Sequence, residues 1–201
     1  MTSNSAALGG AVHADEKAIV TAIDCAITLN SAFNSGGAVG AFGGSVVTTT
    51  DCAITSNYAP WGGAFSSGDK AALTATNCVM SSNAANSGGV VHASGDASLS
   101  LTDCTMASNT AFIGGAVVAS GYSKVSAMGC SMTSNSALGS GGAVLTLDTS
   151  VFIFSDGVIN LNRAIKVRRT PSSCAVTRTV VELTVHCRWT DGRLGRLVAR
   201  L

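Results

Sequence analysis

The chain has 201 residues, of which 23 are glycine, 7 are cysteine and 11% are charged, and its formal net charge is +1. No run of 18 apolar residues occurs, and no charged, apolar and cleavage-site segments open the chain, so neither a membrane-spanning helix nor a signal peptide is predicted within it. The charge is uneven, because residues 1–162 hold three Lys or Arg against nine Asp or Glu, whereas residues 163–201 hold nine against two. Two parts are therefore predicted, residues 1–164 and residues 165–201.

A pair of glycines recurs through the first part of the chain, usually followed by alanine and valine. The pairs stand at steps of 26 or 27 residues: Gly9-Gly10, Gly36-Gly37, Gly62-Gly63, Gly88-Gly89, Gly114-Gly115 and Gly141-Gly142. A period of this length is typical of solenoids, in which each repeat buries its apolar face by stacking on its neighbours. The spacing therefore predicts stacked coils.

Three short runs in each repeat have the composition of β-strands. Residues 99–102, 104–106 and 143–145 are examples, because they are too short for helices and are bounded by Gly, Asn, Asp and Ser. The sequence predicts an all-β fold for residues 1–164. The expected architecture is a right-handed, single-stranded parallel β-helix of about six coils, with three short strands per coil.

The alternation of residues along each coil predicts which side chains face inward. Positions five and three before each repeat cysteine are mostly apolar, as Leu99 and Leu101 are before Cys104, so this parity is expected to point inward. The cysteine and the Ile or Met two positions later are apolar on the opposite parity. The chain is therefore expected to turn a corner just before each cysteine, where Asp or Asn usually stands.

Asparagines and cysteines recur at the same period as the glycine pairs. The asparagines are Asn4, Asn30, Asn57, Asn83, Asn109, Asn135 and Asn162, and the cysteines are Cys25, Cys52, Cys78, Cys104 and Cys130. Stacked at about 4.8 Å per coil, the asparagines are expected to pass amide hydrogen bonds along one column, which is a structural role. The cysteines are expected to form a column of buried free thiols, because parallel Cβ atoms one strand apart exceed the ~3.8 Å that a disulfide prefers.

No metal or cofactor site is predicted. The chain contains no Cys-x-x-Cys motif, and a straight column of cysteines cannot supply the tetrahedral geometry that zinc prefers. His13 and His92 occupy the same coil position but lie three coils apart, about 14 Å at the usual strand spacing, so they are too distant to share an ion.

The repeat carries a resemblance to a known family. Met132-Thr133-Ser134-Asn135, followed by Gly141-Gly142-Ala143-Val144, resembles the FxxN and GGAI repeats of the chlamydial polymorphic outer-membrane proteins, with Ile or Met in place of phenylalanine. The resemblance covers roughly residues 1–164. It implies a right-handed parallel β-helix that is exported to a cell surface and linked to adhesion. Because residues 1–6 repeat the sequence of residues 132–137, the chain is expected to be a fragment of a longer repeat protein.

The second part, residues 165–201, is basic and departs from the repeat. No glycine pair follows Asn162, and Arg-, Thr- and Cys-rich sequence takes its place. Three interpretations stay open: a disordered or out-of-frame segment, an end cap whose residues 177–189 alternate as in an amphipathic strand, and a nucleic-acid-binding tail. Nucleic acid is not the expected partner.

Residues 1–164 offer few groups that favour catalysis. Acidic residues such as Asp24, Asp51 and Asp103 stand about one per coil at turns, whereas glycosidic chemistry needs two carboxylates close together. No catalytic residue is assigned. The predicted function is a non-enzymatic scaffold for adhesion or structural display, outside the cell or on its surface. The expected partners are a cell-surface protein or glycan and neighbouring repeats of the parent chain.

Alternatives from other functional classes stay open. Carbohydrate-active enzymes similar to pectate lyase also use the β-helix fold. The outward residues of one strand per coil would form a Thr-x-Thr array that includes Thr48, Thr50, Thr74 and Thr76 and resembles the ice-binding face of β-solenoid antifreeze proteins. The turn aspartates would offer oxygen ligands of the kind that Ca²⁺ prefers.

Overall fold

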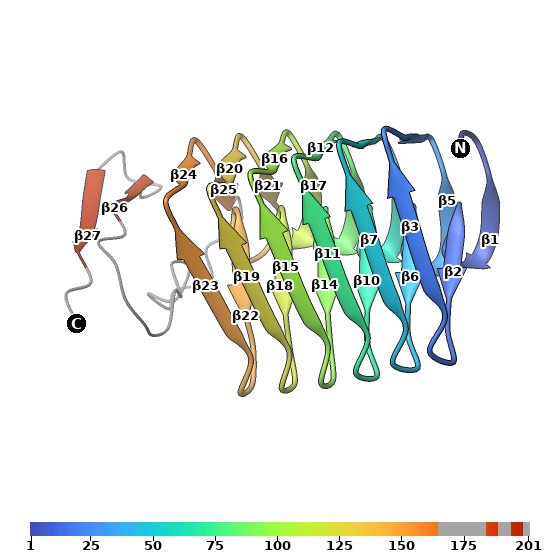
Figure 1. Cartoon of the computed structure of the whole chain (residues 1–201). Coiled ribbons are helices and arrows are strands. Elements are labelled where there is room, and N and C mark those ends of the chain that lie inside the picture. Colours follow the sequence, from blue (N-terminus) through green and yellow to red (C-terminus); the bar gives the residue numbers. More distant parts are fainter. Residues whose placement is uncertain (165–183, 189–193, 199–201) are drawn as a thin grey trace.

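The computed structural model of the chain describes residues 1–164 and two later strands, Thr184–Arg188 and Leu194–Val198. Residues 1–164 form a parallel β-solenoid of about six coils, which confirms the predicted all-β fold (Figure 1). The coils advance from the blue amino-terminal end towards the orange strands, and they wind in the right-handed sense (Figure 1). None of the described residues belongs to a helix that is long and apolar enough to span a membrane.

Four parallel sheets run along the solenoid, and each coil contributes one strand to each of them. We name the sheets after the feature that precedes or marks their strands. The post-Cys sheet contains β4 (Ala26–Thr28), β8 (Ala53–Thr55), β12 (Val79–Ser81), β16 (Thr105–Ala107), β20 (Ser131–Thr133) and β24 (Val158–Asn160). The post-Asn sheet contains β1 (Ser5–Leu8), β5 (Ser31–Ser35), β9 (Tyr58–Trp61), β13 (Ala84–Ser87), β17 (Thr110–Ile113), β21 (Ser136–Ala137) and β25 (Arg163–Ala164).

The other two sheets follow the glycine pairs. The post-Gly sheet contains β2 (Val12–Ala14), β6 (Val39–Ala41), β10 (Phe65–Ser67), β14 (Val91–Ala93), β18 (Val117–Ala119) and β22 (Val144–Thr146). The long-strand sheet contains β3 (Ile19–Ile23), β7 (Val46–Thr50), β11 (Ala72–Thr76), β15 (Ser98–Thr102), β19 (Lys124–Met128) and β23 (Val151–Ser155). Its five-residue strands stand in front in Figure 1.

The prediction of three strands per coil is wrong, because the structure has four. The missed strand follows each asparagine and belongs to the post-Asn sheet. Its inward residue is a small alanine, such as Ala59 or Ala111, and its outward residues differ from coil to coil. Neither feature produces the repeated apolar alternation by which a strand is usually detected.

The predicted inward parity and corner are confirmed. Leu99 and Leu101 are 2% and 0% exposed and lie in the core with Cys104 and Met106. Four of the five cysteines follow a corner residue with φ between 51° and 54°: Asp24, Asp51, Asn77 and Asp103. Gly129, with φ of 65°, makes the corner before Cys130, and Asp156, with φ of 54°, makes the corresponding corner in the next coil, before Gly157. Asp and Asn are the non-glycine residues that enter this left-handed region most readily, which explains why they recur there.

The glycine pair is required by the close approach of neighbouring coils. The first glycine of each pair has a positive φ, which is 67° at Gly62. The second glycine faces the backbone of the next coil, and a Cβ atom added to Gly63 would overlap the carbonyl oxygen of Gly89. A Cβ atom added to Gly62 would overlap the carbonyl oxygen of Phe65, so conformation and space both restrict the first position, and space restricts the second.

The strands β26 (Thr184–Arg188) and β27 (Leu194–Val198) pair in the antiparallel sense. Strand β26 falls within residues 177–189, where the alternation of residues predicts a strand. Residues 165–183, 189–193 and 199–201 lie outside the described part of the chain. The three interpretations of the tail therefore stay predictions.

Candidate binding surfaces

The seven recurring asparagines form a hydrogen-bonded column inside the solenoid. Asn83 Oδ1 accepts hydrogen bonds from the backbone N–H and the side-chain amide of Asn57, both at 3.0 Å. The Asn57 amide also donates to the carbonyl oxygen of Ile27 at 2.9 Å. Asn83 and Asn109 are 0% exposed. Because these bonds use the amide groups within the protein, the column has a structural role and offers nothing to a ligand.

The five repeat cysteines are free thiols in a second internal column. Each Sγ donates to a main-chain oxygen, as Cys104 does to Thr102 at 3.2 Å and to Ala75 at 3.4 Å. Burial raises the pKa of the Cys52 thiol. Hydrogen bonds with Cys130 and Cys78, together with burial, raise the pKa of the Cys104 thiol. A hydrogen bond with Cys104 lowers the pKa of the Cys78 thiol and that of the Cys130 thiol. The Cys52 and Cys104 thiols therefore stay protonated, and all four buried side chains act as small core residues.

The side chains of two of the corner aspartates contact the next coil. The Asn77 amide donates to Asp51 Oδ1, and the Asp103 carboxylate lies where a side chain at position 129 would be, a place left free by Gly129. Within residues 1–164, no three His, Cys, Asp or Glu side chains are placed to hold a metal ion together.

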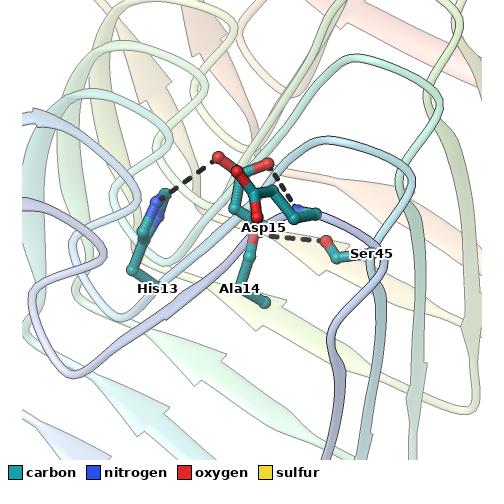
Figure 2. A network of polar contacts seen from close by, with 5 residues as sticks. His13, Ala14, Asp15 and Ser45 are labelled. Carbon is teal, nitrogen blue, oxygen red and sulfur yellow. Dashed lines mark hydrogen bonds and ion pairs between the residues drawn. The ribbon is translucent and has the colours of Figure 1, made fainter.

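Figure 2 shows the polar contacts around the turn between β2 and β3. His13 Nε2 lies 4.0 Å from Asp15 Oδ2, and Asp15 Oδ1 accepts a hydrogen bond from the backbone N–H of the next residue at 2.8 Å. Ser45 Oγ donates to the carbonyl oxygen of Ala14 at 3.2 Å. Both side chains of the ion pair are more than a third exposed, so the pair is weak. The contacts around this turn stabilise its conformation. They do not place a nucleophile next to a base.

His13 and His92 occupy one column of the post-Gly sheet, as predicted. Gly40 and Ser66 separate them in the strand register, so the two imidazoles do not meet. His92 instead contacts Trp61, with ring centroids 5.1 Å apart and planes at 59°. Burial lowers the pKa of His92 to about 4, so its imidazole is neutral at neutral pH.

The outer face of the long-strand sheet carries the predicted hydroxyl array. Thr48 pairs with Thr74, and Thr50 pairs with Thr76, so the side chains form straight columns across the coils. The same two columns continue through Thr21, Ser100, Thr102 and Ser126 and are interrupted by Ile23, Met128 and Ile153. The array is regular over the middle coils and ends in apolar residues.

The outer face of the post-Asn sheet carries a surface that the sequence analysis missed. We name it the aromatic face and define it by the outward residues Phe33, Asn34, Tyr58, Trp61, Asn86, Phe112 and Leu138. Its rings are strongly exposed, at 79% for Phe33, 53% for Phe112 and 46% for Trp61. The signal that could have revealed it is the variable stretch between each Asn-x-Ala and the following glycine pair, where most of the exposed rings stand.

Comparisons with protein-family models, with curated proteins and with solved structures found no match to the chain. The parallel β-solenoid is therefore established by the strand topology itself. The resemblance to the chlamydial repeats rests on the Asn and Gly-Gly motifs alone. Those motifs occupy the internal column and the tight turn, and neither position lies on an outer face.

Proposed function

We propose that residues 1–164 form a non-enzymatic scaffold, displayed on a cell surface or outside the cell, which adheres to other surfaces through an outer face. The observation that carries this proposal is the exposure of aromatic rings on one sheet, spread over the coils of β5, β9 and β17. Exposed apolar patches mark interaction sites, and Tyr, Trp and Phe are enriched where proteins bind partners. The resemblance to the repeats of the chlamydial polymorphic outer-membrane proteins supports the same function.

The positions of the carboxylates argue against the enzymatic alternative. Glycoside hydrolysis uses two carboxylates about 5 to 10 Å apart on either side of the scissile bond. The Asp51 carboxylate, at one of the corners, accepts a hydrogen bond from the Asn77 amide of the next coil. The aromatic face, where a sugar chain would find rings, carries no Asp or Glu in its strands.

Adhesion of coated beads tests the proposal. Beads that carry the full chain should attach to a panel of plant, animal and microbial cells in greater number than beads that carry albumin. Asp51→Asn and Asp103→Asn should leave this attachment unchanged, because no single carboxylate has a catalytic role. Attachment equal to that of albumin on every cell type would contradict the proposal. Release of reducing ends from polysaccharides that is lost in one of the two variants would favour the enzyme instead.

Ice binding is a second candidate function, because Thr48, Thr74, Thr50 and Thr76 stand in register on the long-strand sheet. Regular hydroxyl and methyl groups on a flat sheet would order water in a regular pattern. A solution of the chain would then show thermal hysteresis, which Thr74→Lys would remove and Thr133→Lys, on the post-Cys sheet, would leave intact. We expect no thermal hysteresis from the unmodified chain, since the array ends in Ile23 and Met128.

A further inference from the structure

We propose that the aromatic face binds a neutral polysaccharide chain that lies along the solenoid axis. This inference rests on the proposed function and names the chemical class of its partner. Three features of the post-Asn sheet carry it: the placement of the rings, the free amides between them, and the absence of charge on its first six strands.

The rings of the aromatic face are spread along the axis. Phe33 lies on β5, Tyr58 and Trp61 lie on β9, and Phe112 lies on β17. The register of the sheet sets β9 one coil after β5 and β17 two coils after β9, so the rings cover about 14 Å at the usual strand spacing. The C–H groups on the faces of sugar rings carry partial positive charge and pack against the negative faces of aromatic rings. Rings spread along the axis over this length therefore suit a linear chain of sugars.

Polar side chains that can bind hydroxyl groups stand between the rings. Asn34 and Asn86 are exposed, and their amides make no hydrogen bond within residues 1–164. Asn86 lies on β13, the strand between those of Trp61 and Phe112. An amide offers both donors and an acceptor, which matches the dual character of a sugar hydroxyl. The free amide at this place would bind the hydroxyls of a sugar held between two rings.

The charge of the sheet selects a neutral ligand. Strands β1, β5, β9, β13, β17 and β21 contain no Asp, Glu, Lys, Arg or His, and Arg163 on β25 is the one charged residue in the strands of the sheet. An acidic polysaccharide would find no row of cations there. A protein partner would find no charged rim of the kind that gives protein interfaces their specificity. The hydroxyls and ring faces of a neutral polysaccharide match the uncharged amides and aromatic rings of this sheet better than an acidic polysaccharide or a protein does.

The Trp61 ring is held in place before a ligand binds. The His92 imidazole, on β14 of the neighbouring post-Gly sheet, packs against the indole with centroids 5.1 Å apart. Restricting a side chain in advance lowers the entropy that is lost on binding. Trp61 is still 46% exposed, so one part of the ring stays open to a sugar. We therefore expect Trp61 to contribute most to affinity.

Affinity gel electrophoresis tests this proposal with the full chain. The gels contain hydroxyethyl cellulose, xyloglucan or galactomannan as neutral probes and polygalacturonate as the acidic probe. At least one neutral probe should retard the chain. Trp61→Ala and Phe112→Ala should each weaken that retardation at least fivefold, with partial recovery in Trp61→Phe. Thr74→Ala, on the opposite long-strand sheet, is the matched control and should leave retardation unchanged.

Each other outcome overturns the inference. Migration unaffected by every neutral probe would exclude neutral polysaccharides, and stronger retardation by polygalacturonate would exclude the argument from charge. Retardation that persists in both ring variants would place the site elsewhere. Thermal melts of each variant exclude loss of fold as the cause. If coated beads still adhere to cells and protease treatment of those cells removes the adhesion, the partner is a protein, so the adhesive function stands and this inference fails.

Discussion

The inward and outward sides of the post-Asn sheet follow different rules. Inward, the residue two positions after each asparagine is alanine in every coil, and it is buried in the inner coils. Outward, Pro60, Asn86 and Phe112 occupy one register position with no common size or polarity. The inner side must fit the same backbone spacing in every coil, whereas the outer side meets only solvent or a partner. Residues that repeat from coil to coil are therefore the ones that stabilise the solenoid. Residues that vary from coil to coil are the ones available for function.

Among substitutions on the inner side, replacing the second glycine of a pair should lower the free energy of unfolding the most. A Cβ atom at Gly63 would overlap backbone atoms of the next coil, so Gly63→Ala should lower the free energy of unfolding by about 3 kcal/mol or more. Gly44→Ala is the control, because its Cβ atom would meet nothing closer than Lys17 at 3.9 Å. Its positive φ should cost about 1 kcal/mol. Equal urea midpoints for the two variants would contradict the close approach of the coils.

Two asparagines of one coil allow the contributions of the inner and outer sides to stability to be compared. Asn83→Ala removes the oxygen that accepts hydrogen bonds from the Asn57 backbone N–H and side-chain amide, and should destabilise the chain by about 1 to 3 kcal/mol. Asn86→Ala removes an exposed amide and should change stability by no more than about 0.5 kcal/mol. Thermal melts measure both. A greater loss at Asn86 than at Asn83 would show that the column is not the stabilising element.

The cysteines should react with thiol reagents according to their depth in the stack. Cys25, on the first coil, is partly exposed, whereas Cys104 is 1% exposed and needs local opening before it can react. Cys25 should therefore be labelled at least about tenfold faster, equivalent to ~1.4 kcal/mol of opening. Peptide mapping by mass spectrometry assigns each modified site. Disulfides between adjacent coils of the native chain would contradict the column of free thiols.

The stability of the chain should also depend on pH through the imidazole that contacts Trp61. Burial lowers the pKa of His92 to about 4, compared with 6.5 in an unfolded chain, so the unfolded state binds more protons between these values. The contribution of His92 to stability is full above pH 6.5 and falls as the pH drops towards 4. The urea midpoint of the wild type should therefore fall more steeply over this range than that of His92→Gln. Parallel pH profiles would mean that the imidazole is not buried, and His13→Gln controls for replacing a histidine in the same column.

Much of the inner side could be predicted from the sequence, and little of the outer side could. The glycine pairs, the asparagine column and the inward parity around Leu99 and Cys104 recur because each coil imposes the same spacing and hydrogen bonds. The strand that carries Trp61 escaped detection, because its inward alanine gives a weak apolar signal and its outward residues differ in every coil. No rule of spacing links Phe33, Tyr58, Trp61 and Phe112, and they come together only when the coils are stacked in register.

The most direct test of this account measures stability and binding in one variant, Tyr58→Ser/Trp61→Ser/Phe112→Ser. Surface substitutions usually change stability by about 0.5 kcal/mol or less, so the melting temperature should fall by no more than about 5 °C. Retardation by the neutral polysaccharide that binds the wild type should be lost. A cooperative melt near that of the wild type together with lost retardation is the predicted result. Retained retardation, or a chain that no longer folds, would contradict the claim that the inner columns provide stability and the aromatic face provides binding.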